Sequence, residues 1–320
     1  MKANNENNET SLFQHTLKES FTCVGRGLHT GLNIIMRVMP AEANSGITFV
    51  RRDVDSPYSE IQANWKNVSD TRLSTTIANS SGVRVSTIEH LMAALYAGGV
   101  DNARIVLDGP EVPIMDGSAA PFVDLIKYAG KVKQNSERRA ILIKQLTSVS
   151  SGDKFAGFTP FPISYMKVDI DFDSESIGQQ SFAAEIDEEV FKNQLASART
   201  FGFKEQVSTL HKLGLAQGGS LENVILVENG NVVNKEGLRY KDEFVRHKMI
   251  DSIGDIALAG ARVIGRFTGV RNGHQLNNEL IQKLMVHEHT WEYTTIRKAN
   301  EFWQEQLLSP YYDLKTLVVN

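Results

Sequence analysis

The sequence predicts an α+β fold made of two domains, and three observations support this. The chain has 320 residues, which at about 150 residues per domain suggests two hydrophobic cores rather than one. Strand-like alternation and helical periodicity both occur in each half of the chain, as expected for α+β architecture. A polar stretch at 131–139 follows neither period and is interpreted as a linker between the halves.

The first half reads as three strands and two helices. Alternating apolar residues predict strands at 33–39, 46–50 and 103–107. Ser86 to Tyr96 predicts a helix that ends at Gly98-Gly99, and a second amphipathic segment begins near Pro121. Residues 1–15 are expected to be a disordered tail, because they start with a run rich in Asn and Glu. The first domain should therefore span 16–130.

The second half, 140–320, continues with further strands and two helices. The strands are expected at 140–143, 167–172, 224–227 and 265–268. A long helix is predicted from about 241 to 260, and a final helix from about 277 to 285. No internal sequence repeat is evident.

Composition narrows the function classes. The formal net charge is -4, so the chain lacks the basic excess of a nucleic-acid-binding protein. The single cysteine, Cys23, excludes an intramolecular disulfide and fits a reducing compartment. The chain has neither a signal-peptide pattern nor an apolar run of about 18 residues. A soluble, cytoplasmic, monomeric protein is expected.

The predicted long helix carries three ionisable groups on one side. His247, Asp251 and Asp255 are four residues apart, which places them within an arc of about 80°. Apolar residues occupy the opposite side, as in an ordinary core-facing helix. A histidine and an aspartate at this spacing can offer one nitrogen and one oxygen ligand to a zinc ion. Spacing alone favours the alternative, a solvated ion pair worth a few tenths of a kcal/mol, because such pairs are frequent on helices.

A second candidate is the Glu89-His90 pair near the start of the predicted helix at 86–96. His90 would complete a ligand set with His247 and Asp251, leaving a fourth position for water. Glu89 could then take a proton from that water. The alternative is a capping box, in which Ser86 and Glu89 only satisfy backbone donors at the helix start.

Two further histidine motifs carry less information. His274 follows Gly273 in an expected loop, where it could act as an acid or a positive charge with Asp255 as its partner, or could simply be exposed. His287 and His289 are two residues apart, so on a helix they diverge by about 200°. We interpret these two as a surface feature.

Taken together, these segments resemble the zinc-dependent UDP-3-O-acyl-N-acetylglucosamine deacetylases of lipid A biosynthesis in Gram-negative bacteria. The resemblance runs from about 16 to 294, and several motifs occur in the family's order. They are Gly25–Gly31, Ser86–Leu91, Asp108–Ser118, Ala198–Phe203, Gly218–Ser220, Asp242–Lys248, Asp251–Asp255 and Gly273-His274. The resemblance implies two α+β domains of similar topology, each a sheet packed on helices, with the active site between them.

The resemblance also implies residue roles. His90, His247 and Asp251 match the zinc ligands, and Fe²⁺ would accept the same donors. Glu89 matches the general base, and His274 the acidic or cationic histidine. The remaining matches are Asp255 as the partner of His274, Thr200 as the oxyanion donor, and Phe201, Gly202, Lys248 and Gly219 as substrate-binding residues. An insertion for the acyl chain is placed loosely around 173–184.

The implied reaction is hydrolysis of the N-acetyl group of UDP-3-O-acyl-N-acetylglucosamine, giving acetate and the free amine. The sequence does not decide whether Glu89 or His274 protonates the departing amine. Two alternatives stay open: a zinc amidase acting on another N-acylated sugar, and a non-catalytic protein that binds a sugar nucleotide.

Overall fold

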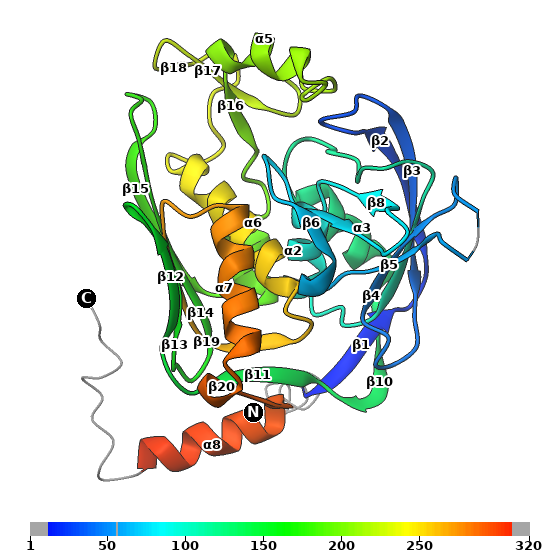
Figure 1. The fold of residues 1–320 in the computed structure, drawn as a ribbon, viewed down its shortest axis with the longest axis vertical. Helices are drawn as coiled ribbons and strands as arrows, with labels where there is room; N and C mark the ends of the chain where they lie inside the picture. The colour runs from blue at the N-terminus through cyan, green and yellow to red at the C-terminus, as the bar shows by residue number, and fades with distance from the viewer. Residues whose placement is uncertain (1–11, 56, 309–320) are drawn as a thin grey trace.

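The structure is a computed structural model that describes residues 12–55 and 57–308 (Figure 1). Two main sheets lie on opposite sides of the molecule, and helices α2 (Glu89–Ala97), α6 (Glu243–Ala257) and α7 (His274–Val286) lie between them. Buried apolar residues of both halves join in one cluster around these helices. The predicted α+β class is confirmed.

The sheet of the first half has the strand order β2-β3-β9-β4-β5. Its strands alternate buried and exposed residues, because one face packs against the core while the other meets solvent. The bounds are β2 (Phe21–Arg26), β3 (Asn33–Pro40), β4 (Ile47–Arg51), β5 (Glu60–Gln62) and β9 (Ala103–Leu107). The strands predicted at 33–39, 46–50 and 103–107 are thus confirmed.

A short segment and a small sheet connect this sheet to helix α2. They are η1 (Trp65–Asn67), β6 (Val68–Asp70), β7 (Thr76–Ala78) and β8 (Arg84–Val85). Helix α3 (Ala120–Ala129) follows β9, as the amphipathic pattern near Pro121 predicted, and carries that proline in its first turn.

The sheet of the second half has the order β12-β13-β19-β11-β20, with β14 beside β19 and β15 beside β14. Strand β19 runs parallel to both β11 and β14. The bounds are β11 (Arg139–Ile143), β12 (Thr147–Ser151), β13 (Lys154–Thr159), β14 (Ser164–Phe172), β15 (Gly178–Glu185), β19 (Arg262–Val270) and β20 (Trp291–Thr295). Four further helical segments belong to the second half: α4 (Glu188–Val190), η2 (Phe191–Leu195), η3 (Glu288–Thr290) and α8 (Ile296–Leu308).

A small separate unit interrupts the second half between η2 and α6. It contains β16 (Phe201–Phe203), α5 (Lys204–Lys212), β17 (Ile225–Glu228) and β18 (Asn231–Val232). It lies at one end of the molecule, at the top of Figure 1. Residues 173–184, around which the acyl-chain insertion is predicted, form the turn after β14 and most of β15, a strand paired along β14. The position of the insertion stays a prediction.

Two segments that lack apolar periodicity are more regular than their sequence suggests. Residues 131–139, which are predicted to be the linker, contain strand β10 (Lys131–Glu137), paired antiparallel with β1 (Phe13–Leu17). This strand buries little apolar surface, so it leaves no periodic signal in the sequence. The same pairing orders residues 13–15 of the expected tail, where Gln14 is buried and bonded to Asn44. Residues 1–11 lie outside the described residues.

The division into domains at 16–130 and 140–320 stays a prediction. Within the described ranges, no helix is both long enough and apolar enough to cross a membrane.

Candidate active site

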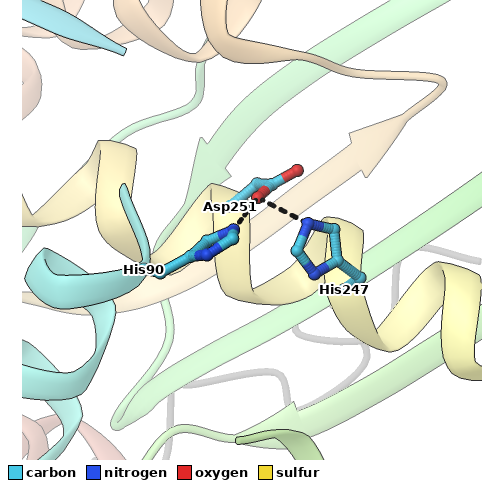
Figure 2. Close-up of side chains that lie close together, drawn as sticks. All are labelled: His90, His247 and Asp251. Carbon is cyan, nitrogen blue, oxygen red and sulfur yellow. Dashed lines mark ion pairs between the residues drawn. The ribbon is translucent and has the colours of Figure 1, made fainter. Parts of the chain in front are cut away.

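The ligand triad of His90, His247 and Asp251 converges between the two halves of the chain (Figure 2). His90 comes from α2, and the other two come from α6. Asp251 Oδ1 lies 3.5 Å from His90 Nε2 and 3.3 Å from His247 Nε2. All three side chains are buried, and one potential ligand atom from each lies within 4.8 Å of the others. The structure thus brings together three groups that could hold one metal ion.

Close packing of α2 on α6 brings the triad together. A Cβ atom at Gly254 would overlap the backbone carbonyl of Glu89, so only glycine permits this approach. On α6, the i, i+4 spacing of His247 and Asp251 then turns both side chains toward His90. The alternative of a solvated ion pair on α6 is wrong, because His247 and Asp251 are 3% and 5% exposed.

The charge state of the triad suits a cation. Burial lowers the pKa of His247 to about 4, so its imidazole is neutral at pH 7 and can offer a lone pair. Its Nδ1 lies 3.2 Å from the carbonyl oxygen of Ala198, which fixes the ring with Nε2 toward Asp251. Burial opposes ionisation of Asp251, but the ammonium group of Lys248 holds the pKa of its carboxyl well below the ordinary value.

Glu89 lies at the start of α2, but it does not cap the helix. Ser86 donates to the carbonyl of Pro110, and Glu89 Oε2 accepts a hydrogen bond of 3.0 Å from the backbone N–H of Thr75. The helix begins at Glu89 without a side-chain cap, so the capping-box alternative is wrong. Burial raises the pKa of the Glu89 carboxyl above its ordinary value, against the opposing positive charge of His274.

His274 faces Glu89 across the site. Its Nε2 lies 4.0 Å from Glu89 Oε1, and its Nδ1 lies 2.9 Å from Asp255 Oδ2. Burial alone would lower the pKa of His274, but the charge and hydrogen bond of Asp255 raise it to about 9. The imidazole is therefore cationic at pH 7. It occupies the first position of α7, not the loop that the sequence suggested.

A cleft of about 450 Å³ opens beside these groups. It is lined by positively charged, negatively charged and apolar side chains, among them Ile170, Phe172, Thr200, Phe201, His247, Lys248, Asp251 and His274. Four residues predicted to act in catalysis or substrate binding line this cleft: Thr200, Phe201, Lys248 and His274. Gly202 and Gly219 do not line the cleft: Gly202 is on β16, and Gly219 packs near Leu28.

Lys248 is held within the site by an ion pair. Its Nζ lies 2.7 Å from Asp251 Oδ2, which is the carboxylate oxygen turned away from the two imidazoles. The His287 and His289 rings are exposed at the end of α7, which confirms the surface interpretation.

Sequence reasoning missed two residues that complete the Asp255 environment. Thr75 Oγ1 lies 2.5 Å from Asp255 Oδ1, and Asn277 Nδ2 donates to Asp255 Oδ2 at 2.8 Å. Asn277 is one helical turn after His274, which is a signal that could have found it. Thr75 is 180 positions from Asp255 in sequence, so no local pattern could have indicated it.

A buried set of two imidazoles and a carboxylate, beside a second carboxylate and a cationic imidazole, could hold a metal ion and serve hydrolysis. Comparison with known proteins then identifies the family. Residues 14–286 match the LpxC family, described as UDP-3-O-acyl N-acetylglycosamine deacetylase, and the chain belongs to this family.

Named relatives agree with this assignment. A UDP-3-O-acyl-N-acetylglucosamine deacetylase of Phenylobacterium zucineum is 46% identical over 284 residues, covering 89% of this chain and 97% of the relative. The protein of the same name from Pasteurella multocida is 43% identical, covering 88% and 93%. The one from a Geobacter species is 47% identical, covering 86% and 89%.

Proposed function

We propose that the chain hydrolyses the N-acetyl group of UDP-3-O-acyl-N-acetylglucosamine, using one zinc ion held by His90, His247 and Asp251. The products are acetate and the free-amine sugar nucleotide. The observation that carries the proposal is the convergence of the ligand triad beside Glu89 and His274. Family membership and the names of the relatives supply the substrate.

The chemistry of the triad and two of its three internal distances fit a zinc ion. Ligands about 2.0–2.1 Å from a tetrahedral ion lie roughly 3.3 Å from each other. The distances from Asp251 Oδ1 to His247 Nε2 and to His90 Nε2 are 3.3 and 3.5 Å. Neutral imidazoles and an ionised carboxylate are the forms that bind such a metal, and Fe²⁺ accepts the same set. When bound, the ion supplies Lewis-acid polarisation of the amide carbonyl and acidifies water.

Glu89 is placed to take a proton from the attacking water. Its carboxylate is buried next to His90, and Thr75 holds one of its oxygens. The other oxygen faces His274 at 4.0 Å. Proton transfer requires a base within hydrogen-bond reach of the water, and Glu89, which adjoins His90 at the start of α2, is the candidate for that base.

His274 and Thr200 are placed to stabilise the tetrahedral oxyanion. The imidazolium carries a positive charge that Asp255 sustains at pH 7. The Thr200 backbone is fixed by hydrogen bonds to Gly117 and Ile225, and its side chain lines the cleft. Fixed donors and charges in a buried site are effective because they need no reorganisation during the reaction. Either His274 or Glu89 then protonates the departing amine.

The cleft suits an acylated sugar nucleotide. Ile170, Phe172 and Phe201 give it an apolar side that an acyl chain can contact. Lys154 and Arg271 line it elsewhere and can contact the phosphates, although Arg271 is ion-paired with Asp153 and Asp171 here. Lys248 also lines the cleft, although Asp251 holds its ammonium group here.

Two measurements test the proposal against its alternatives. Protein purified without chelator should contain about one equivalent of zinc or iron, and less than half would favour a non-catalytic sugar-nucleotide binding protein. Deacetylation should be much faster with the 3-O-acyl chain on the substrate than without it. Equal rates on both substrates would indicate an amidase for other N-acylated sugars.

A further inference from the structure

Thr75 connects the two groups that would exchange protons in the active site. It immediately precedes β7, in a turn where Leu73 has a φ of +62°. Its side chain is 2% exposed. Its backbone N–H donates to Glu89 Oε2 at 3.0 Å, and its hydroxyl contacts both Asp255 and His274. A non-glycine residue at positive φ beside a catalytic group marks a backbone conformation held by its surroundings.

The direction of the Thr75 hydrogen bonds follows from charge. A carboxylate oxygen accepts, so the Thr75 hydroxyl donates its only proton to Asp255 Oδ1, at 2.5 Å. Asp255 Oδ2 accepts from His274 Nδ1, at 2.9 Å, and from Asn277. The hydroxyl oxygen lies 3.2 Å from the same Nδ1, where its lone pair faces the imidazolium. Thr75 therefore holds Asp255 in the orientation that points His274 Nε2 at Glu89.

The backbone of Thr75 fixes Glu89, which lies opposite His274. Its N–H holds Glu89 Oε2, and its carbonyl accepts from the N–H of Ile88, the residue before α2. Glu89 Oε1 is left facing His274 Nε2 at 4.0 Å. One residue thus sets the position of a carboxylate on α2 and of an imidazole on α7.

We propose that Thr75 is a positioning residue for the deacetylation, whose hydroxyl orients the Asp255–His274 pair relative to Glu89. This inference rests on the proposed function, since it assigns Thr75 a part in the same reaction. It concerns kcat rather than substrate binding, because Thr75 does not line the cleft.

The test compares Thr75→Val with Thr75→Ser. Valine keeps the β-branched shape and the backbone N–H, but it removes the hydroxyl; serine keeps the hydroxyl. Thr75→Val should lower kcat about 10-fold with KM and zinc content unchanged, the scale of one hydrogen bond to an ionised group. Thr75→Ser should stay within about 2-fold of the wild type, and Thr75→Ala replaces the valine variant if that one does not fold.

A double-variant cycle separates positioning from a general loss of stability. In a His274→Ala background, Thr75→Val should cause no further fall in kcat, because the group that it orients is gone. An equal 10-fold loss in both backgrounds, or wild-type kcat in Thr75→Val, would overturn the inference. Thr147→Val is the matched control, since it removes a buried threonine hydroxyl that bonds to Thr290 and does not line the cleft. A wild-type protein without deacetylase activity would instead refute the proposed function.

Discussion

At the scale of single residues, the site depends on burying charged groups in pairs. Asp251 is paired with Lys248, and His274 is paired with Asp255. Burial without such partners would neutralise each group. Burial leaves His247 neutral, so the two imidazoles differ in charge: His247 is neutral, as a metal ligand must be, and His274 is cationic, as an electrostatic stabiliser must be.

Replacing Glu89 by glutamine should abolish most of the catalysis without unfolding the protein. The amide oxygen can still accept from the Thr75 N–H, but it cannot take a proton from water. We expect kcat to fall about 100-fold or more, with zinc content and melting temperature close to the wild type. Steady-state kinetics with metal analysis checks this, and wild-type turnover would exclude Glu89 as the base.

Replacing Asp255 by asparagine should shift the pH dependence. In the wild type the cationic form of His274 is present below a pKa of about 9, so activity should decline as pH rises through that value. Without the carboxylate, burial dominates and the pKa of His274 falls. The alkaline limb of the kcat profile should therefore move to lower pH in Asp255→Asn. An unmoved limb would show that another group titrates there.

At the scale of elements, the sequence predicted the α6 stripe correctly because it is local. His247, Asp251 and Asp255 need only helical spacing to share a side, and the helix formed as expected. His274 was misplaced in a loop because Gly273 signals a turn, although here Gly273 precedes the first residue of α7. The Thr75 contacts could not be predicted, since they join segments that only the tertiary fold brings together.

Gly254→Ala should weaken both packing and metal binding. Alanine favours a helix over glycine by about 1 kcal/mol, so propensity alone would stabilise the protein. The added methyl group, however, overlaps the Glu89 carbonyl and must push α2 away from α6. We expect a lower melting temperature and weaker zinc affinity in competition with a chelator. A stabilised variant with unchanged affinity would show that the helices are not in such close contact.

At the scale of the whole molecule, the site exists only where the two halves meet. One candidate ligand comes from α2 and two come from α6, with sheets on both outer sides (Figure 1). The sequence resemblance implied the metal-binding roles of these residues, while the residues alone left each motif ambiguous between structural and functional roles. The paired strands β1 and β10 escaped prediction because they are held by backbone hydrogen bonds rather than by an apolar face.

A metal bound between the halves should stabilise the whole fold. A ligand that binds only the native state raises stability by about 2.7 kcal/mol at 100 times its dissociation constant. Removing the metal with a chelator should therefore lower the melting temperature, and adding zinc should restore it. Asp251→Ala should make the melting temperature insensitive to the chelator. Persistent sensitivity in that variant would place the stabilising metal elsewhere.

The most direct test of the central claim is a crystal structure of the metal-loaded protein with anomalous diffraction measured at the zinc absorption edge. We predict one anomalous peak about 2.0–2.2 Å from a nitrogen of His90, a nitrogen of His247 and an oxygen of Asp251. Loaded protein that shows no peak there, or shows one only at another site such as His287 and His289, would contradict the account.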